Sequence, residues 1–194
     1  RGSALATMAP SVKLNGGAPV ISATNADFII NGNLATSNRD LTLHAASGKT
    51  LTLNGVFSGG YLPQFGGVGI SKTGDGTVVL AGNNSFSAPI DFTAGSLMLL
   101  HNNALSPNIP SLTMAEDTTL IVGNGVSVGN RSVALSGVLE FQGTSTWSST
   151  GGLELMGPKA AILASGTTGT LNSTTPIDYT GNSLQLSAKT GATL

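Results

Sequence analysis

The sequence predicts an all-β fold, a parallel β-helix or solenoid in which short strands stack coil upon coil. Three observations predict it. Apolar residues alternate with other residues in short triplets, turns rich in Gly and Asn separate the triplets, and related segments recur at steps near 20 residues.

The triplets place two apolar side chains on one face of an expected strand, which is the period-two pattern of a strand with one buried side. They are Leu41 to Leu43, Leu51 to Leu53, Val78 to Leu80, Leu97 to Leu99, Leu120 to Val122, Leu139 to Phe141, Leu153 to Leu155 and Leu184 to Leu186. Between them, clusters such as 31–33 and 82–84 carry the Gly and Asn residues that sharp corners favour.

An internal repeat turns these strands into an architecture. The segment 48–55 resembles the segment 75–82, which aligns Thr50 with Thr77, 27 residues later. Further units begin at Ser96, Thr119 and Val138, at steps of 19, 23 and 19 residues. Steps near 20 residues suit one coil of a solenoid, so we expect a single β-helix segment over 1–194 with roughly nine coils. A β-sandwich is the alternative, because its strands also alternate and recur at a spacing of about 8 to 12 residues.

The composition excludes several classes of protein. Hydrophobic residues make up 40% of the chain, which argues against a disordered linker despite 27 glycines. The net charge is −1 and the eight basic residues are scattered, so we expect no nucleic-acid partner. No apolar run is long enough to span a bilayer. The first residues, 1–3, are either a tag remnant or native sequence, and we interpret the chain as a segment of a longer protein.

The segment 70–105 carries an ordered pattern of Lys, Gly, Asn, aromatic and apolar residues: Lys72, Gly74, Gly76, Thr77, Val78, Leu80, Gly82, Asn83, Asn84, Phe86, Ala94, Gly95, Leu97, Leu99, Ala104 and Leu105. This pattern resembles the passenger-associated transport repeat of bacterial autotransporters. The pattern departs from the repeat at 87–90, where Pro89 lacks a backbone donor and should lie at a corner outside a strand.

The resemblance implies a right-handed parallel β-helix that is secreted across the outer membrane and folds outside the cell. Such proteins carry a membrane barrel, which we do not expect in this chain, so the link to a membrane would be indirect. The implied location is the cell surface or the secreted fraction, associated with the outer membrane in the parent protein.

Candidate catalytic residues are few, and we expect a protein that is not an enzyme and needs no cofactor or metal. The two histidines, His44 and His101, each follow a triplet and should point outward at a strand end. Glu140 and Glu154 lie in the middle of triplets, and we expect them on different faces of the solenoid. A polysaccharide-acting enzyme on the same fold would instead require these carboxylates to converge in a groove.

Three aromatic residues are candidates for binding a partner. The long step between Thr50 and Thr77 predicts a projecting loop at 58–67, where Tyr61 and Phe65 either bind a sugar or protein or fold back over the coils. Trp147 lies among hydroxyl residues and either binds a partner or caps a coil.

These observations favour a rigid surface stalk that supports adhesion or self-association. The candidate partners are a second copy of the chain, a host surface protein or a glycan. A folding and secretion module without a ligand is the second hypothesis, and a polysaccharide-acting enzyme is the third.

Overall fold

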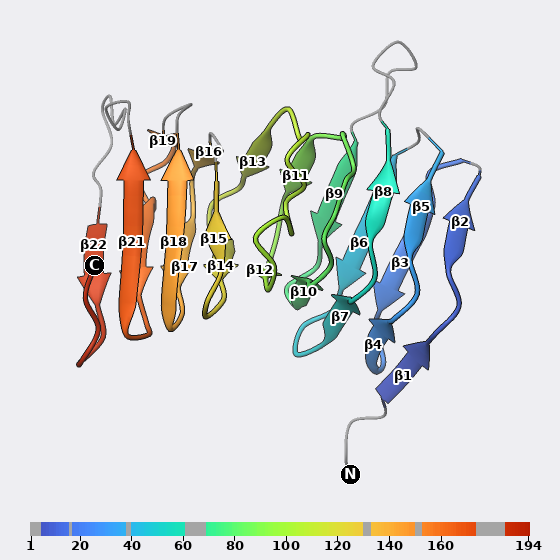
Figure 1. The fold of residues 1–194 in the computed structure, drawn as a ribbon, viewed down its shortest axis with the longest axis horizontal. Helices are drawn as coiled ribbons and strands as arrows, with labels where there is room; N and C mark the ends of the chain where they lie inside the picture. The colour runs from blue at the N-terminus through green and yellow to red at the C-terminus, as the bar shows by residue number, and fades with distance from the viewer. Residues whose placement is uncertain are drawn as a thin grey trace.

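The computed structural model describes residues 5–15, 17–37, 40–60, 69–129, 133–149, 153–173 and 185–194, and within them every regular element is a β-strand. The strands stack along one long axis, and their order along that axis follows their order in the sequence (Figure 1). The paired strands described in the four sheets are all parallel, as expected of a solenoid.

The longest sheet forms one side of the solenoid and contains nine strands. In order they are β1 (Leu5–Met8), β4 (Asp27–Ile30), β7 (Thr50–Leu53), β10 (Thr77–Leu80), β12 (Ser96–Leu99), β14 (Thr119–Val122), β17 (Val138–Phe141), β20 (Ala161–Ala164) and β22 (Gln185–Ala188).

A second sheet contains seven strands. They are β3 (Val20–Ala23), β6 (Leu41–Ala45), β9 (Ile70–Thr73), β11 (Ile90–Phe92), β13 (Leu112–Met114), β16 (Val133–Leu135) and β19 (Leu153–Leu155).

The third side of the solenoid is divided into two sheets of three strands each. One contains β2 (Val12–Leu14), β5 (Leu34–Thr36) and β8 (Phe57–Gly59), and the other contains β15 (Ser127–Val128), β18 (Thr144–Ser149) and β21 (Thr168–Ser173). The coils between β8 and β15 therefore have no strand on this side within the described stretch 69–126.

The predicted register is confirmed. Thr77 pairs with Thr50 and with Ser96, and Thr119 pairs with Ser96 and with Val138. The steps of 27, 19, 23 and 19 residues therefore each correspond to one coil. The longest sheet has nine strands, one from each coil, but the second sheet has only seven. The solenoid therefore has about seven full turns and not the nine expected.

The core runs along the interior between the sheets. The expected alternation is seen in the strands β7, β12, β14, β17 and β20, where the second and fourth residues are buried and the others are partly exposed. Pro89 precedes β11 and accepts a hydrogen bond from the amide of Ile70, so it lies outside a strand as predicted. The parallel stacking rules out the β-sandwich alternative.

Candidate functional site

A lysine occupies a position in the hydrophobic core of the segment that resembles the transport repeat. In the seven-stranded sheet, Lys72 of β9 is in register with Leu43 of β6 and Phe92 of β11, which are both buried. Its side chain is only 1% exposed. The stem packs among apolar residues, and the ammonium nitrogen lies 5.5 Å from the centre of the Phe92 ring.

The ammonium group of Lys72 is satisfied by backbone carbonyls. Its Nζ atom donates hydrogen bonds to the carbonyl oxygens of Gly74 at 2.6 Å, Gly76 at 2.8 Å and Ala94 at 2.5 Å. Gly74 and Gly76 form the corner that follows β9, whereas Ala94 belongs to the next coil. We call this arrangement the lysine clasp, because one side chain joins two coils.

The lysine clasp needs glycine at the same corner of the next coil. A Cβ atom on Gly95 would lie 2.6 Å from Lys72 Nζ and 2.5 Å from the carbonyl oxygens of Gly74 and Gly76. Burial lowers the pKa of Lys72 to about 8, and the carboxylate of Asp75 partly opposes this shift. The group is therefore mainly protonated at neutral pH.

A buried asparagine joins three coils at the interrupted third side. Asn84 is 2% exposed, and its Oδ1 atom accepts a hydrogen bond from the amide of Phe57 at 2.8 Å. Its Nδ2 atom donates to the carbonyl of Ala104 at 2.7 Å. These bonds satisfy backbone groups that a continuous strand ladder would otherwise pair.

The remaining residues of the resemblance have packing roles. Gly82 stacks on the corner of the preceding coil, where a Cβ atom would lie 2.1 Å from the carbonyl oxygen of Gly55. Phe86 is buried, and its ring centre lies 4.6 Å from that of Phe57. Asn83 accepts a hydrogen bond from the side-chain amide of Asn103. Thr77 is the first residue of β10, and the side chains of Leu80 and Leu97 are buried in the core.

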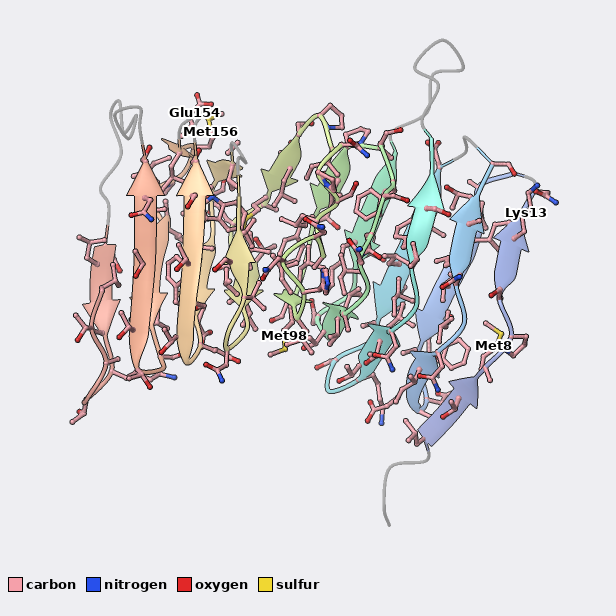
Figure 2. All side chains as sticks on the ribbon, viewed as in Figure 1. Met8, Lys13, Met98, Glu154 and Met156 are labelled. Carbon is pink, nitrogen blue, oxygen red and sulfur yellow. The ribbon has the colours of Figure 1, made fainter. Side chains whose placement is uncertain are left out.

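The outward side of the nine-stranded sheet carries a line of apolar side chains. The third position of each strand from β4 to β20 faces outward, and these positions are in direct register. Val79 on β10 is nevertheless covered by its neighbours and is only 7% exposed. We call them the outer column, and its residues are Ile29, Thr52, Val79, Met98, Ile121, Glu140 and Leu163. Met98 points away from the coils at the edge of the structure (Figure 2).

The outward side of the seven-stranded sheet is chemically different. Its aligned outward residues, from β6 to β19, are Thr42, Ser71, Asp91, Thr113, Ala134 and Glu154. A continuous line of apolar side chains is therefore found on the nine-stranded sheet, whereas the exposed apolar residues of the seven-stranded side are separate: Val20, in register with Thr42, and Met156, which follows β19. The sequence indicates the apolar column, because the middle residue of a triplet faces outward and this residue is apolar at Val79, Met98 and Ile121.

The structure places the predicted aromatic candidates as follows. Trp147 is fully buried on β18, so its indole packs in the core and offers no surface to a partner in this conformation. Tyr61 and Phe65 lie outside the described residues. The expected loop at 58–67 begins too early, because Ser58 and Gly59 belong to β8 and pair with β5.

The predicted polar candidates are dispersed. Glu140 lies on β17 of the nine-stranded sheet and Glu154 on β19 of the seven-stranded sheet, so the expected separation onto different faces is confirmed. Glu154 and Met98 lie on opposite sides of the solenoid (Figure 2). Glu140 accepts hydrogen bonds from the Ser165 hydroxyl and the Gln142 amide. The two carboxylates therefore do not form the groove that a polysaccharide-acting enzyme would require.

The two histidines bond to neighbours at strand ends. The Nδ1 atom of His44 lies 3.0 Å from the Thr73 hydroxyl, and that of His101 accepts a hydrogen bond from the amide of Asn103. Among the described residues, no three His, Asp or Glu side chains are grouped so as to hold a metal ion. The described part of the chain also contains no helix long and apolar enough to cross a membrane.

Comparison with known proteins supports the resemblance to autotransporter passengers. The chain is 31% identical over 110 residues to the Adhesin BmaC autotransporter of Brucella suis biovar 1 (strain 1330). The matched region covers 57% of this chain and 3% of that adhesin. No family model matches the chain, so the resemblance of 70–105 to the transport repeat rests on the residues named above. No solved structure matches either.

The fold and the sequence similarity agree. The chain is a parallel β-solenoid, and it is similar to a short stretch of an autotransporter adhesin. In the described residues, the buried polar groups of Lys72 and Asn84 join neighbouring coils. The outer face of the nine-stranded sheet carries the apolar outer column, whereas the aligned outward residues of the seven-stranded sheet from β6 to β19 are mostly polar.

Proposed function

We propose that this chain is a rigid stalk segment of a bacterial cell-surface or secreted autotransporter adhesin, and that it supports adhesion or self-association. The observation that carries the proposal is the unbroken nine-stranded parallel sheet, which links successive coils from β1 to β22. The adhesin name of the similar protein supports the same class and gives no support to an enzymatic role.

Surface display tests this proposal. The 194-residue chain is attached to a generic outer-membrane anchor on a non-adherent bacterium, and attachment to host cells and settling of the culture are measured. We expect the displayed chain to raise at least one of them. A variant with disrupted coil stacking, Gly55→Ala, should lose the effect, because a Cβ atom would lie 2.3 Å from the carbonyl oxygen of Gly32. Equal attachment and settling by the anchor alone would reject the proposal.

A folding and secretion module is a second candidate, and the lysine clasp favours it. Lys72 and Asn84 both lie within 70–105, and both join coils through buried hydrogen bonds. If this segment promotes secretion and folding outside the cell, deleting 70–105 should reduce the amount of chain displayed on the surface. It should reduce the attachment per displayed molecule less. Unchanged display would reject this second candidate.

A further inference from the structure

We propose that the outer column of the nine-stranded sheet, centred on Met98 and Ile121, is the surface on which a second copy of this chain docks side by side. The inference rests on the proposed function and specifies its self-association partner. Met98 and Ile121 are direct neighbours on β12 and β14, and Val79 precedes them in the same line.

The chemistry of this face favours a protein surface of the same kind. Five of the seven residues of the outer column are apolar, and Leu100, which follows β12 on the same side, is 45% exposed. The outer column holds no aromatic ring on which a saccharide could stack, and the hydroxyl residues Thr50, Thr77, Ser96 and Thr119 form a separate outward column beside it. Apolar side chains on a flat strand surface instead suit a matching apolar surface.

The charge of this face is compatible with contact between identical copies. On the strands from β4 to β20, the ionisable residues at outward positions are Asp27 and Glu140. Asp27 accepts a hydrogen bond from the amide of Thr50, and Glu140 is held by Ser165 and Gln142. The centre of the face, around Met98, carries no charge that would repel an identical face.

The size and spacing of the face also match a second copy. Four residues across each strand and seven strands along the axis give a surface roughly 13 Å by 34 Å, or about 440 Å² per copy. A pair would bury about 900 Å², which is close to the lower limit of a specific interface, so we expect a weak dimer. The rungs of both copies repeat at about 4.8 Å, so side chains of one copy fit between the rungs of the other.

Sedimentation of the full chain over a wide concentration range tests the surface. We expect wild type to dimerise and Met98→Lys/Ile121→Lys to dimerise roughly tenfold or more weakly, because like charges would meet across the interface. The matched control is Thr113→Lys/Ala134→Lys, which adds the same charge at outward, neighbouring rungs of the seven-stranded sheet. It should dimerise like wild type. Circular dichroism checks that each variant keeps its β-structure.

A mixing experiment identifies the partner as a second copy. Met98→Lys/Ile121→Lys mixed with Met98→Glu/Ile121→Glu should restore dimers that neither variant forms alone. Leu5→Lys/Leu186→Lys tests end-to-end contact instead, because these side chains are exposed on the outermost strands β1 and β22. A monomeric wild type, equal weakening by the control, or weakening by only the end variant would overturn the proposal.

The display assay separates this proposal from the proposed function. If Met98→Lys/Ile121→Lys lowers settling but not attachment to host cells, side-by-side pairing is supported. If wild type is monomeric and this variant loses host attachment, the face binds a host protein and pairing is overturned. If wild type neither settles nor attaches, the proposed function fails, whatever sedimentation shows.

Discussion

The Nζ atom of Lys72 lies 5.5 Å from the centre of the Phe92 ring, which occupies the same inward column one coil later. The same nitrogen donates to the carbonyl of Ala94 in that coil. The aromatic face and the carbonyls both stabilise a positive charge, which explains how an ammonium group is accommodated in a hydrophobic core.

Lys72→Met should weaken the contact between coils. The methionine fills similar space, but it removes the lysine donor from the carbonyls of Gly74 and Ala94, whereas the carbonyl of Gly76 still accepts from the amide of Ser96. We expect the free energy of unfolding in urea to fall by about 2 kcal/mol or more, since unsatisfied buried acceptors cost about 1 to 3 kcal/mol each. Lys13→Met is the control, because Lys13 is exposed on β2. Equal stability of the two variants would contradict the role of the clasp.

The lysine clasp also predicts a dependence of stability on pH. Burial lowers the pKa of Lys72 to about 8 in the folded chain, whereas its ordinary value is 10.5. Between these values the unfolded chain binds more protons, so the free energy of unfolding rises with pH. The difference between wild type and Lys72→Met should therefore increase from pH 8 towards 10, with a slope of up to about 1.4 kcal/mol per pH unit. Urea titrations at several pH values measure it, and a flat or falling difference would contradict the prediction.

Asn84→Ala should be far more destabilising than Asn83→Ala. The first substitution leaves the amide of Phe57 and the carbonyl of Ala104 unpaired in the interior, at an expected cost of about 2 kcal/mol or more. The second removes one exposed side-chain bond to Asn103, which should cost about 0.5 kcal/mol or less. Thermal unfolding followed by circular dichroism compares these adjacent residues. Equal losses would indicate that burial at this corner does not determine the effect.

Gly55→Ala should destabilise the solenoid, whereas Gly129→Ala should not. The added Cβ atom at Gly55 would lie 2.3 Å from the carbonyl oxygen of Gly32, but nothing lies within 4 Å of the same position at Gly129. Forced overpacking costs about 1 to 3 kcal/mol, so we expect a lower unfolding midpoint for Gly55→Ala alone. Denaturant unfolding by circular dichroism measures the difference, and a stable Gly55→Ala would show that the corner can widen.

The sequence was sufficient to predict strand register because alternation and turn spacing act locally. Aligning Thr50 with Thr77 places Leu51 beside Val78 and Leu53 beside Leu80, as the structure has them. Other features depend on contacts between coils. Lys72 is buried because carbonyls of two coils converge on it, and the period-two pattern alone does not reveal such acceptors. Trp147 lies in the core because β18 runs from Thr144 to Ser149, a strand whose hydroxyl residues hid its alternation.

The division of the third side has a mechanical consequence. From β1 to β22 the nine-stranded sheet joins every coil through backbone bonds, but between β8 and β15 the third side depends partly on side chains such as Asn84 and Ser106. A pull along the long axis therefore meets unequal resistance around the circumference. The coils would separate first on the third side while the nine-stranded sheet remains paired. The solenoid would therefore bend before its coils separate completely.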